Sequence, residues 1–143
     1  MKDKERAMIS GTYINMPIKN VEATRAFFGG LGFSFNEQFS GETALAVTLN
    51  DNTAAMMLQE EFFKTFISTP LVDAKKSTEV LIAIQLADRA AVDEMTAKAL
   101  ASGATKTREA QDLGFMYSTS FHDLDGHIWE PFWMTSEQPP EGA

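Results

Sequence analysis

The sequence predicts an α+β fold in which one strand–helix–strand–strand–strand pattern occurs twice. The first observation is the order of segments, because each half has a β-like run, an amphipathic helix and three further β-like runs. The second is the spacing of Gly32 and Gly103, which stand about 70 residues apart and each follow a predicted helix. The chain is therefore expected to form one domain of two βαβββ modules, at about residues 11–60 and 78–135.

The first module begins with the run TYINMPI at 12–18, whose alternation is typical of a strand. The following residues, VEATRAFFGGLGF, predict a helix of about ten residues with Asn20 as its N-cap and glycines at its end. Turn residues then separate three β-like runs, at 33–38, 43–49 and 54–59.

The second module repeats this order with a strand at 79–86 and a helix at 88–103 whose N-cap is Asp88. Weaker β-like runs follow it, at 105–109, 115–121 and 127–134. A linker at 61–77, which contains one predicted helical turn, joins the modules. The last residues, 136–143, are expected to form a disordered tail.

Composition and charge restrict the classes of partner. The chain has 143 residues, 44% of them hydrophobic and 22% charged, as in an ordinary globular protein. Its formal net charge of −8 argues against nucleic acid and anionic membranes, because both require a basic surface. The absence of cysteine excludes disulfides and thiolate ligands. Without a membrane-spanning apolar run or a secretory signal, the protein is expected to be cytoplasmic.

Three segments carry a resemblance to a known superfamily. They are IKNVEATRAFFGGLGFSF at 18–35, EVLIAIQLADRAAVDEMTAKALASGA at 79–104 and FHDLDGHIWE at 121–130. With the strand order, they resemble the glyoxalase, bleomycin-resistance and extradiol-dioxygenase superfamily, also called vicinal oxygen chelate proteins, over about residues 11–135. The combination looks most like small bacterial proteins of the lactoylglutathione-lyase-like kind.

The resemblance implies that the two modules form an eight-stranded open cup around the active site. It also implies a homodimer and, in many members, a divalent metal with His and Glu ligands from four strands. The matching positions of this chain are Tyr13, Met57, Leu81 and Glu130. Only Glu130 is a ligand of the expected kind, so the conventional metal site is disfavoured and no cofactor is expected.

Two alternatives for the cup remain open. One is a noncanonical metal site rich in oxygen ligands, from Asn15, Gln59, Glu79 and Glu130. The other is a metal-free pocket, because an apolar cavity with a few polar groups suits a small molecule. Glu130 is the candidate catalytic residue of this pocket. The residues predicted to line it are Tyr13, Asn15, Met57, Gln59, Glu79, Leu81 and Phe132.

The segment FHDLDGHIWE also holds His122, Asp123, Asp125 and His127, all of which are possible metal ligands. Its DLDG portion is typical of a turn, in which Asp side chains cap the backbone and Gly126 permits positive φ. These residues are therefore expected to shape the turn before the last strand. The two histidines are expected to flank this turn, away from the face that carries Glu130.

Two classes of function fit these observations. The first is a glyoxalase-like lyase or isomerase, in which Glu130 acts as general base on a proton next to a carbonyl group. The second is a non-catalytic protein that sequesters an aromatic or cationic compound, because the chain is acidic and rich in Phe and Met. In both cases the partner is a small molecule bound in the cup.

Overall fold

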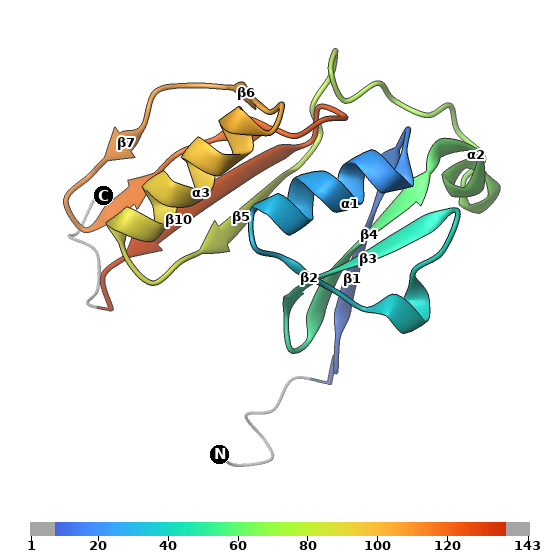
Figure 1. The fold of residues 1–143 in the computed structure, drawn as a ribbon, viewed down its shortest axis with the longest axis horizontal. Coiled ribbons are helices and arrows are strands. Elements are labelled where there is room, and N and C mark those ends of the chain that lie inside the picture. The colour runs from blue at the N-terminus through green and yellow to red at the C-terminus, as the bar shows by residue number, and fades with distance from the viewer. Residues whose placement is uncertain (1–7, 137–143) are drawn as a thin grey trace. The chain divides into compact units, whose positions relative to one another are not determined.

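The computed structural model describes residues 8–136, and the chain divides into two compact units between Pro70 and Leu71. This boundary falls inside the linker expected at 61–77. The predicted tail lies outside the described residues, apart from Ser136. Each unit combines a β-sheet with a helix of ten or more residues (Figure 1). Within 8–136, no helix is long and apolar enough to cross a membrane.

The first unit contains a four-stranded sheet with the order β1–β4–β3–β2. Strands β1 and β4 are parallel, and the other neighbours are antiparallel. The strands are β1 (Thr12–Ile18), β2 (Ser34–Phe35), β3 (Ala44–Asn50) and β4 (Thr53–Gln59). Helix α1 packs on β3 and β4. The helices are α1 (Val21–Gly30), η2 (Glu37–Phe39), α2 (Glu60–Phe63) and η3 (Lys64–Phe66).

Helix α1 begins and ends where its sequence predicts. The side chain of Asn20 caps its N-terminus, because Oδ1 accepts a hydrogen bond of 2.8 Å from the backbone N–H of Ala23. The helix ends at Gly30, and Gly32 follows with a φ of 99°, a conformation that favours glycine. Phe27 and Phe28 point inward from this helix and are buried in the core of the unit.

The core of the first unit lies between α1 and one face of the sheet. Met57 on β4 is paired with Met16 on β1 and with Leu45 on β3, and all three side chains are buried. Paired residues project to the same side of a sheet, so these side chains form one apolar face. The alternate residues of β1, which include Tyr13 and Asn15, are exposed on the other face. The alternation predicted for β1 is therefore confirmed.

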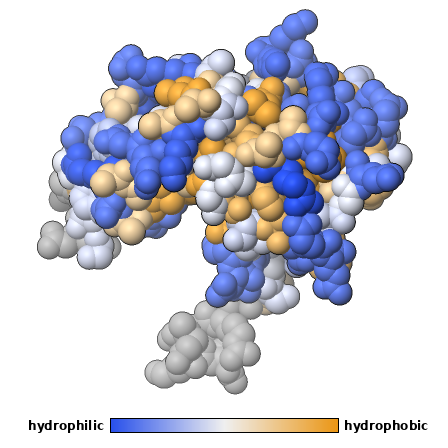
Figure 2. Space-filling model, in the orientation of Figure 1, coloured by the Kyte–Doolittle hydropathy of each residue, from blue (hydrophilic) through white to orange (hydrophobic). Residues whose placement is uncertain are grey.

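The second unit contains a six-stranded sheet in which β10 is central. β10 is parallel to β5 and antiparallel to β8 and β9. The strands are β5 (Leu81–Gln85), β6 (Thr105–Lys106), β7 (Gln111–Asp112), β8 (Met116–Ser118), β9 (Phe121–His122) and β10 (Ile128–Met134). Helix α3 (Arg89–Ala101) covers the face that holds buried Trp129, and Asp88 caps it as predicted. Its outward side carries hydrophilic residues interspersed with apolar ones (Figure 2).

The β-like run expected at 115–121 is divided into β8 and β9, and the cause is a proline. Thr119 donates a hydrogen bond of 3.0 Å from its backbone N–H to the carbonyl of Pro131 on β10. Pro131 has no N–H to donate in return, so the ladder is interrupted at this point. The short strand β7, which pairs with β8, was not predicted from the sequence.

Arg89, the first residue of α3, joins this helix to the sheet. Its guanidinium donates hydrogen bonds of 2.8 and 3.0 Å to the two carboxylate oxygens of Asp112. These bonds lower the pKa of Asp112 to about 2. The same guanidinium lies 5.2 Å and 5.1 Å from the ring centroids of Tyr117 and Trp133, within the range of a cation–π contact.

Candidate ligand-binding site

A cleft of about 540 Å³ lies on the face of the first sheet that is turned away from α1. Its floor is formed by Ala46, Ala54 and Met56, which are neighbours in the register of β3 and β4. Tyr13 and Phe39 line it with aromatic rings and are 68% and 63% exposed. The volume and the largely apolar floor are typical of a small-molecule site.

Polar residues line the same cleft, and most of them carry uncharged amide or hydroxyl groups. Asn15 comes from β1, Asn36 precedes η2, and Asn50 ends β3 at the turn toward β4. Asp51 in that turn is the charged residue of the lining. The cleft thus combines an apolar floor with hydrogen-bonding groups contributed by separate elements of the unit.

Two of the predicted pocket residues lie in this cleft and two do not. Tyr13 and Asn15, which were expected to line one pocket, both line this cleft. Met57 is instead fully buried on the opposite face, because β4 presents Met56 to the cleft. Gln59 stands two residues after Met57 and therefore shares its face, away from the cleft, and its Oε1 accepts the backbone N–H groups of Glu61 and Phe62 in the first turn of α2. At this position β4 therefore presents Met56 to the cleft in place of the expected Met57, because a shift of one residue reverses the face.

The predicted residues of the second unit lie around Glu130 on β10. Leu81 is level with Ile128, so it shares the face that carries Glu130 and Phe132. Glu79 differs from the expectation, because β5 begins at Leu81 and Glu79 is an exposed residue before the strand. One face of this sheet therefore carries Glu130, Leu81 and Phe132. Glu79 is not part of this face, because it precedes β5.

Glu130 forms an ion pair with Arg108, a residue that no sequence motif indicates. Arg108 Nη2 lies 3.3 Å from Glu130 Oε2 and 3.1 Å from Ser118 Oγ, and Nη1 donates to the carbonyl of Glu109. The side chains of Arg108 and Glu130 are 35% and 23% exposed. A carboxylate on an apolar strand requires such a partner, but no local pattern indicates which cation supplies it.

The turn expected between the last two strands is confirmed. Asp123 is buried, and its Oδ1 accepts the backbone N–H groups of Asp125 and His127 at 3.0 and 2.9 Å. Its Oδ2 accepts the indole N–H of Trp129 at 2.9 Å, and Gly126 has the expected positive φ of 94°. Burial raises the pKa of Asp123, while nearby His127 and these N–H donors oppose the rise.

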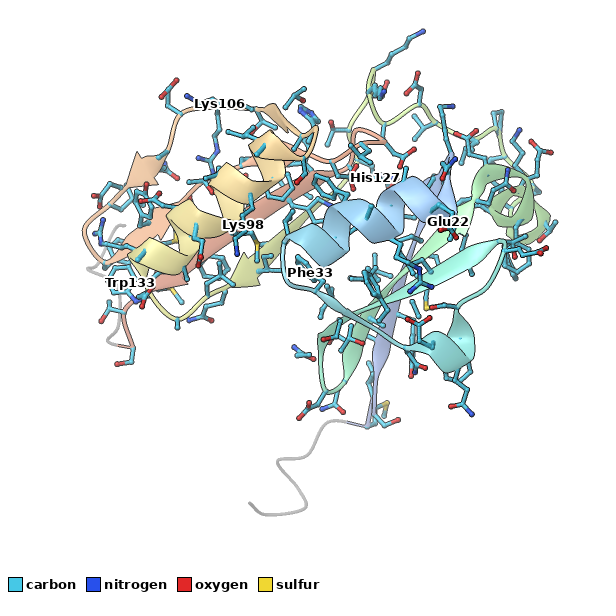
Figure 3. The ribbon with its side chains drawn as sticks, viewed as in Figure 1. Glu22, Phe33, Lys98, Lys106, His127 and Trp133 are labelled. Atoms are coloured by element: carbon cyan, nitrogen blue, oxygen red, sulfur yellow. The ribbon has the colours of Figure 1, made fainter. Side chains whose placement is uncertain are left out.

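Of the two histidines, His122 differs in position from what was expected. His127 belongs to the turn directly before β10. Figure 3 shows it at one end of this strand, with Trp133 near the other end. His122, however, is paired with Ile128 and so shares the face of Glu130. The expectation that both histidines lie away from this face is therefore wrong for His122, because β9 extends one residue further along β10 than the turn motif suggested.

The residues at the metal-ligand positions of the resembled superfamily do not fit a divalent metal. Tyr13 and Leu81 replace the usual histidines, and the β4 position is methionine whichever face is considered. Asn15 and Gln59, proposed together for a noncanonical site, lie on opposite faces of the first sheet. Among residues 8–136, no group of three or more His, Cys, Asp or Glu side chains could hold a metal ion.

Comparisons with known proteins show which solved structures have a similar fold. No family model and no curated protein matches the chain. The hypothetical protein SA1046 from S. aureus superposes with a TM-score of 0.76 at 21% identity, over 89% of this chain and 95% of that one. A glyoxalase/bleomycin resistance protein/dioxygenase family enzyme from Burkholderia phytofirmans PsJN gives 0.72 at 18% identity, over 90% and 100%.

The fosfomycin resistance protein FosX from Listeria monocytogenes also matches, with a TM-score of 0.64 at 22% identity, over 90% of this chain and 97% of that one. This chain shares its mixed α+β fold, with two sheets and few helices, with these structures. The chain therefore has the fold of the glyoxalase, bleomycin-resistance and dioxygenase proteins.

Proposed function

We propose that this protein binds a small organic molecule in the cleft of the first unit. The observation that carries the proposal is the cleft itself, whose volume of about 540 Å³ is suited to such a ligand. The fold supports it, because one similar structure is described as a glyoxalase/bleomycin resistance protein/dioxygenase family enzyme and another as a fosfomycin resistance protein. Since a fold hosts many functions, the choice of ligand follows from the lining residues.

The exposed rings of Tyr13 and Phe39 favour a ligand with a flat apolar part. Both rings line the cleft, although each is more than half exposed to solvent. Exposed aromatic side chains beside an apolar floor offer stacking surfaces that become buried when a planar ligand is bound. This arrangement suits the sequestering of an aromatic compound, one of the two functions that the sequence leaves open.

The proposal predicts a different effect for two similar exposed phenylalanines. Phe39 lines the cleft and is 63% exposed, whereas Phe66 is 67% exposed and lies outside the cleft lining. Phe39→Ala should weaken the binding of aromatic ligands by about tenfold, because a lost stacking contact costs about 0.5–1.5 kcal/mol. Phe66→Ala should leave affinity unchanged.

Titrations of the two variants with an aromatic fragment library, followed by backbone amide NMR signals, test this. The proposal requires shifts that cluster on Tyr13, Ala46 and Met56. Binding that perturbs other residues, or that is weakened equally by both substitutions, would contradict the cleft as the binding site.

A second candidate is a lyase or isomerase activity, which the Arg108–Glu130 pair favours. A carboxylate can take a proton from the carbon next to a carbonyl group, and the electron pair then moves to the carbonyl oxygen. Arg108 lies within 3.3 Å of Glu130, where its guanidinium would donate hydrogen bonds to the resulting enolate oxygen. In this mechanism Glu130 is the catalytic base and Arg108 stabilises the developing negative charge.

Proton exchange in D₂O tests the catalytic candidate. Hydroxyacetone and the hemithioacetal of methylglyoxal with glutathione should lose the proton next to the carbonyl faster with the protein than in buffer. Glu130→Gln should abolish this acceleration, because an amide is not a base at neutral pH. Glu109→Gln makes the same change at a neighbouring acid that pairs with Lys106 and should have no effect. If the wild-type protein exchanges this proton no faster than buffer does, the activity is rejected for these substrates. If Glu130→Gln exchanges it as fast as the wild type, Glu130 is not the base.

A further inference from the structure

We infer that the cleft of the first unit selects ligands with uncharged hydrogen-bond acceptors, such as carbonyl and hydroxyl groups, and disfavours carboxylates, phosphates and phosphonates. The inference rests on the proposed binding function and names the class of ligand for the same cleft. It follows from the orientation of two asparagine amides and from the charges of the lining residues.

Two asparagines of the lining are held with their N–H donors free. Asn36 Oδ1 accepts the backbone N–H of Gln38 at 3.0 Å, and Asn50 Oδ1 accepts that of Asn52 at 3.0 Å. Only the oxygen of an amide can accept a backbone N–H, so these bonds assign the two ends of each amide. The Nδ2 groups of Asn36 and Asn50 have no protein acceptor among the residues that the structure describes.

The two free donors come from different parts of the unit. Asn36 precedes η2, and Asn50 stands at the end of β3. Because both residues line the same cleft, a bound ligand with two acceptors can satisfy both Nδ2 groups. Asn15 differs, since its own Nδ2 donates to the carbonyl of Tyr13 at 3.3 Å. The donors of Asn36 and Asn50 are therefore the pair that is available for recognition.

The charges around the cleft discriminate against anions. Asp51 is the charged residue of the lining, and no Lys, Arg or His of the described part lines this cleft. An anion that enters would lose hydration without gaining a cationic partner, which is costly. The formal net charge of −8 adds a repulsive field. An uncharged acceptor gains the same hydrogen bonds from the amides at a much smaller desolvation cost.

A matched series of phenyl compounds separates these ligand classes. Benzamide and benzyl alcohol carry uncharged acceptors, whereas benzoate and phenylphosphonate place an anion on the same ring. The full-length protein labelled with ¹⁵N reports binding through the side-chain NH₂ signals of Asn36 and Asn50. We expect benzamide and benzyl alcohol to shift these signals and to bind about tenfold more tightly than the two anions.

Substitution of the two amides by carboxylates tests the role of the donors. Asn36→Asp and Asn50→Asp keep an oxygen that accepts the backbone N–H, so the local turns are preserved. Each variant replaces the free donor by an acceptor and should weaken benzamide binding by about tenfold. Asn20→Asp makes the same change at the N-cap of α1, outside the cleft lining, and should leave the affinity unchanged.

The outcomes distinguish the ligand class from the binding function. Benzoate or phenylphosphonate that binds in the cleft as tightly as benzamide would overturn the inference and leave the cleft as a binding site. So would Asn36→Asp and Asn50→Asp variants that bind benzamide as well as Asn20→Asp does. If no compound of the series or of the wider fragment library shifts a resonance of the cleft, the proposed function itself fails, and the inference with it.

Discussion

Replacement of Asp123 by alanine is expected to lower the free energy of unfolding by about 3 kcal/mol or more. The buried carboxylate accepts the backbone N–H groups of Asp125 and His127 and the indole N–H of Trp129. Alanine would leave these donors without their acceptor, and a buried donor that is left unsatisfied costs about 1–3 kcal/mol. Trp129 is fully buried, so water cannot replace the lost acceptor at its indole without local rearrangement.

Urea unfolding of the wild type, Asp123→Ala and Asp123→Asn measures this effect. The asparagine variant keeps one oxygen for the two backbone donors but turns an N–H donor toward Trp129, so its loss should be intermediate. The same order should appear in the melting temperatures. If the alanine variant is within about 0.5 kcal/mol of the wild type, the typical range for a neutral surface change, the turn does not depend on this carboxylate.

Met57→Ala is the second substitution with a large expected effect. Met57 is fully buried against Met16 and Leu45, and truncation of a buried Met to Ala typically costs about 2–5 kcal/mol. Its neighbour Met56 is only partly buried and lines the cleft, so Met56→Ala should cost less than about 1 kcal/mol. The same Met56 substitution should change the affinity for an aromatic ligand, because it removes part of the cleft floor.

These two adjacent methionines provide a control for each other. Chemical denaturation gives the stability of each variant, and ligand titration at a temperature where both are folded gives the affinity. We expect Met57→Ala to lose stability with little change in affinity, and Met56→Ala to show the opposite. A large stability loss at Met56 with none at Met57 would mean that β4 presents the reverse face to the cleft.

The long regular elements were predictable because several local signals agree for each of them. β1 alternates clearly, and α1 and α3 have Asn20 and Asp88 as caps. The face of β4 was not predictable, because AAMMLQ is apolar at both parities and alternation cannot choose between Met56 and Met57. The assembly into a homodimer and the cytoplasmic location stay predictions.

The candidate site was less predictable than the fold. Arg108 and Glu130 are 22 residues apart in sequence, and only the pairing of strands brings them within 3.3 Å. The free donors of Asn36 and Asn50 depend on which backbone N–H each amide oxygen accepts, a property of turn geometry rather than of residue type. Sequence patterns describe which residues are polar, but the partner of each polar group is a tertiary property.

Pro131 has a consequence for the folding of the second unit. A slip of β8 and β9 by two residues along β10 would keep every side chain on its correct face, so hydrophobic patterning does not oppose it. The backbone ladder does not oppose it either, because the missing N–H belongs to Pro131 and the interruption would occur opposite the proline in every alignment. The alignment must therefore be set by contacts of particular side chains. One of them is the 2.6 Å hydrogen bond between the hydroxyl groups of Thr119 and Thr96, which ties the interrupted position to α3.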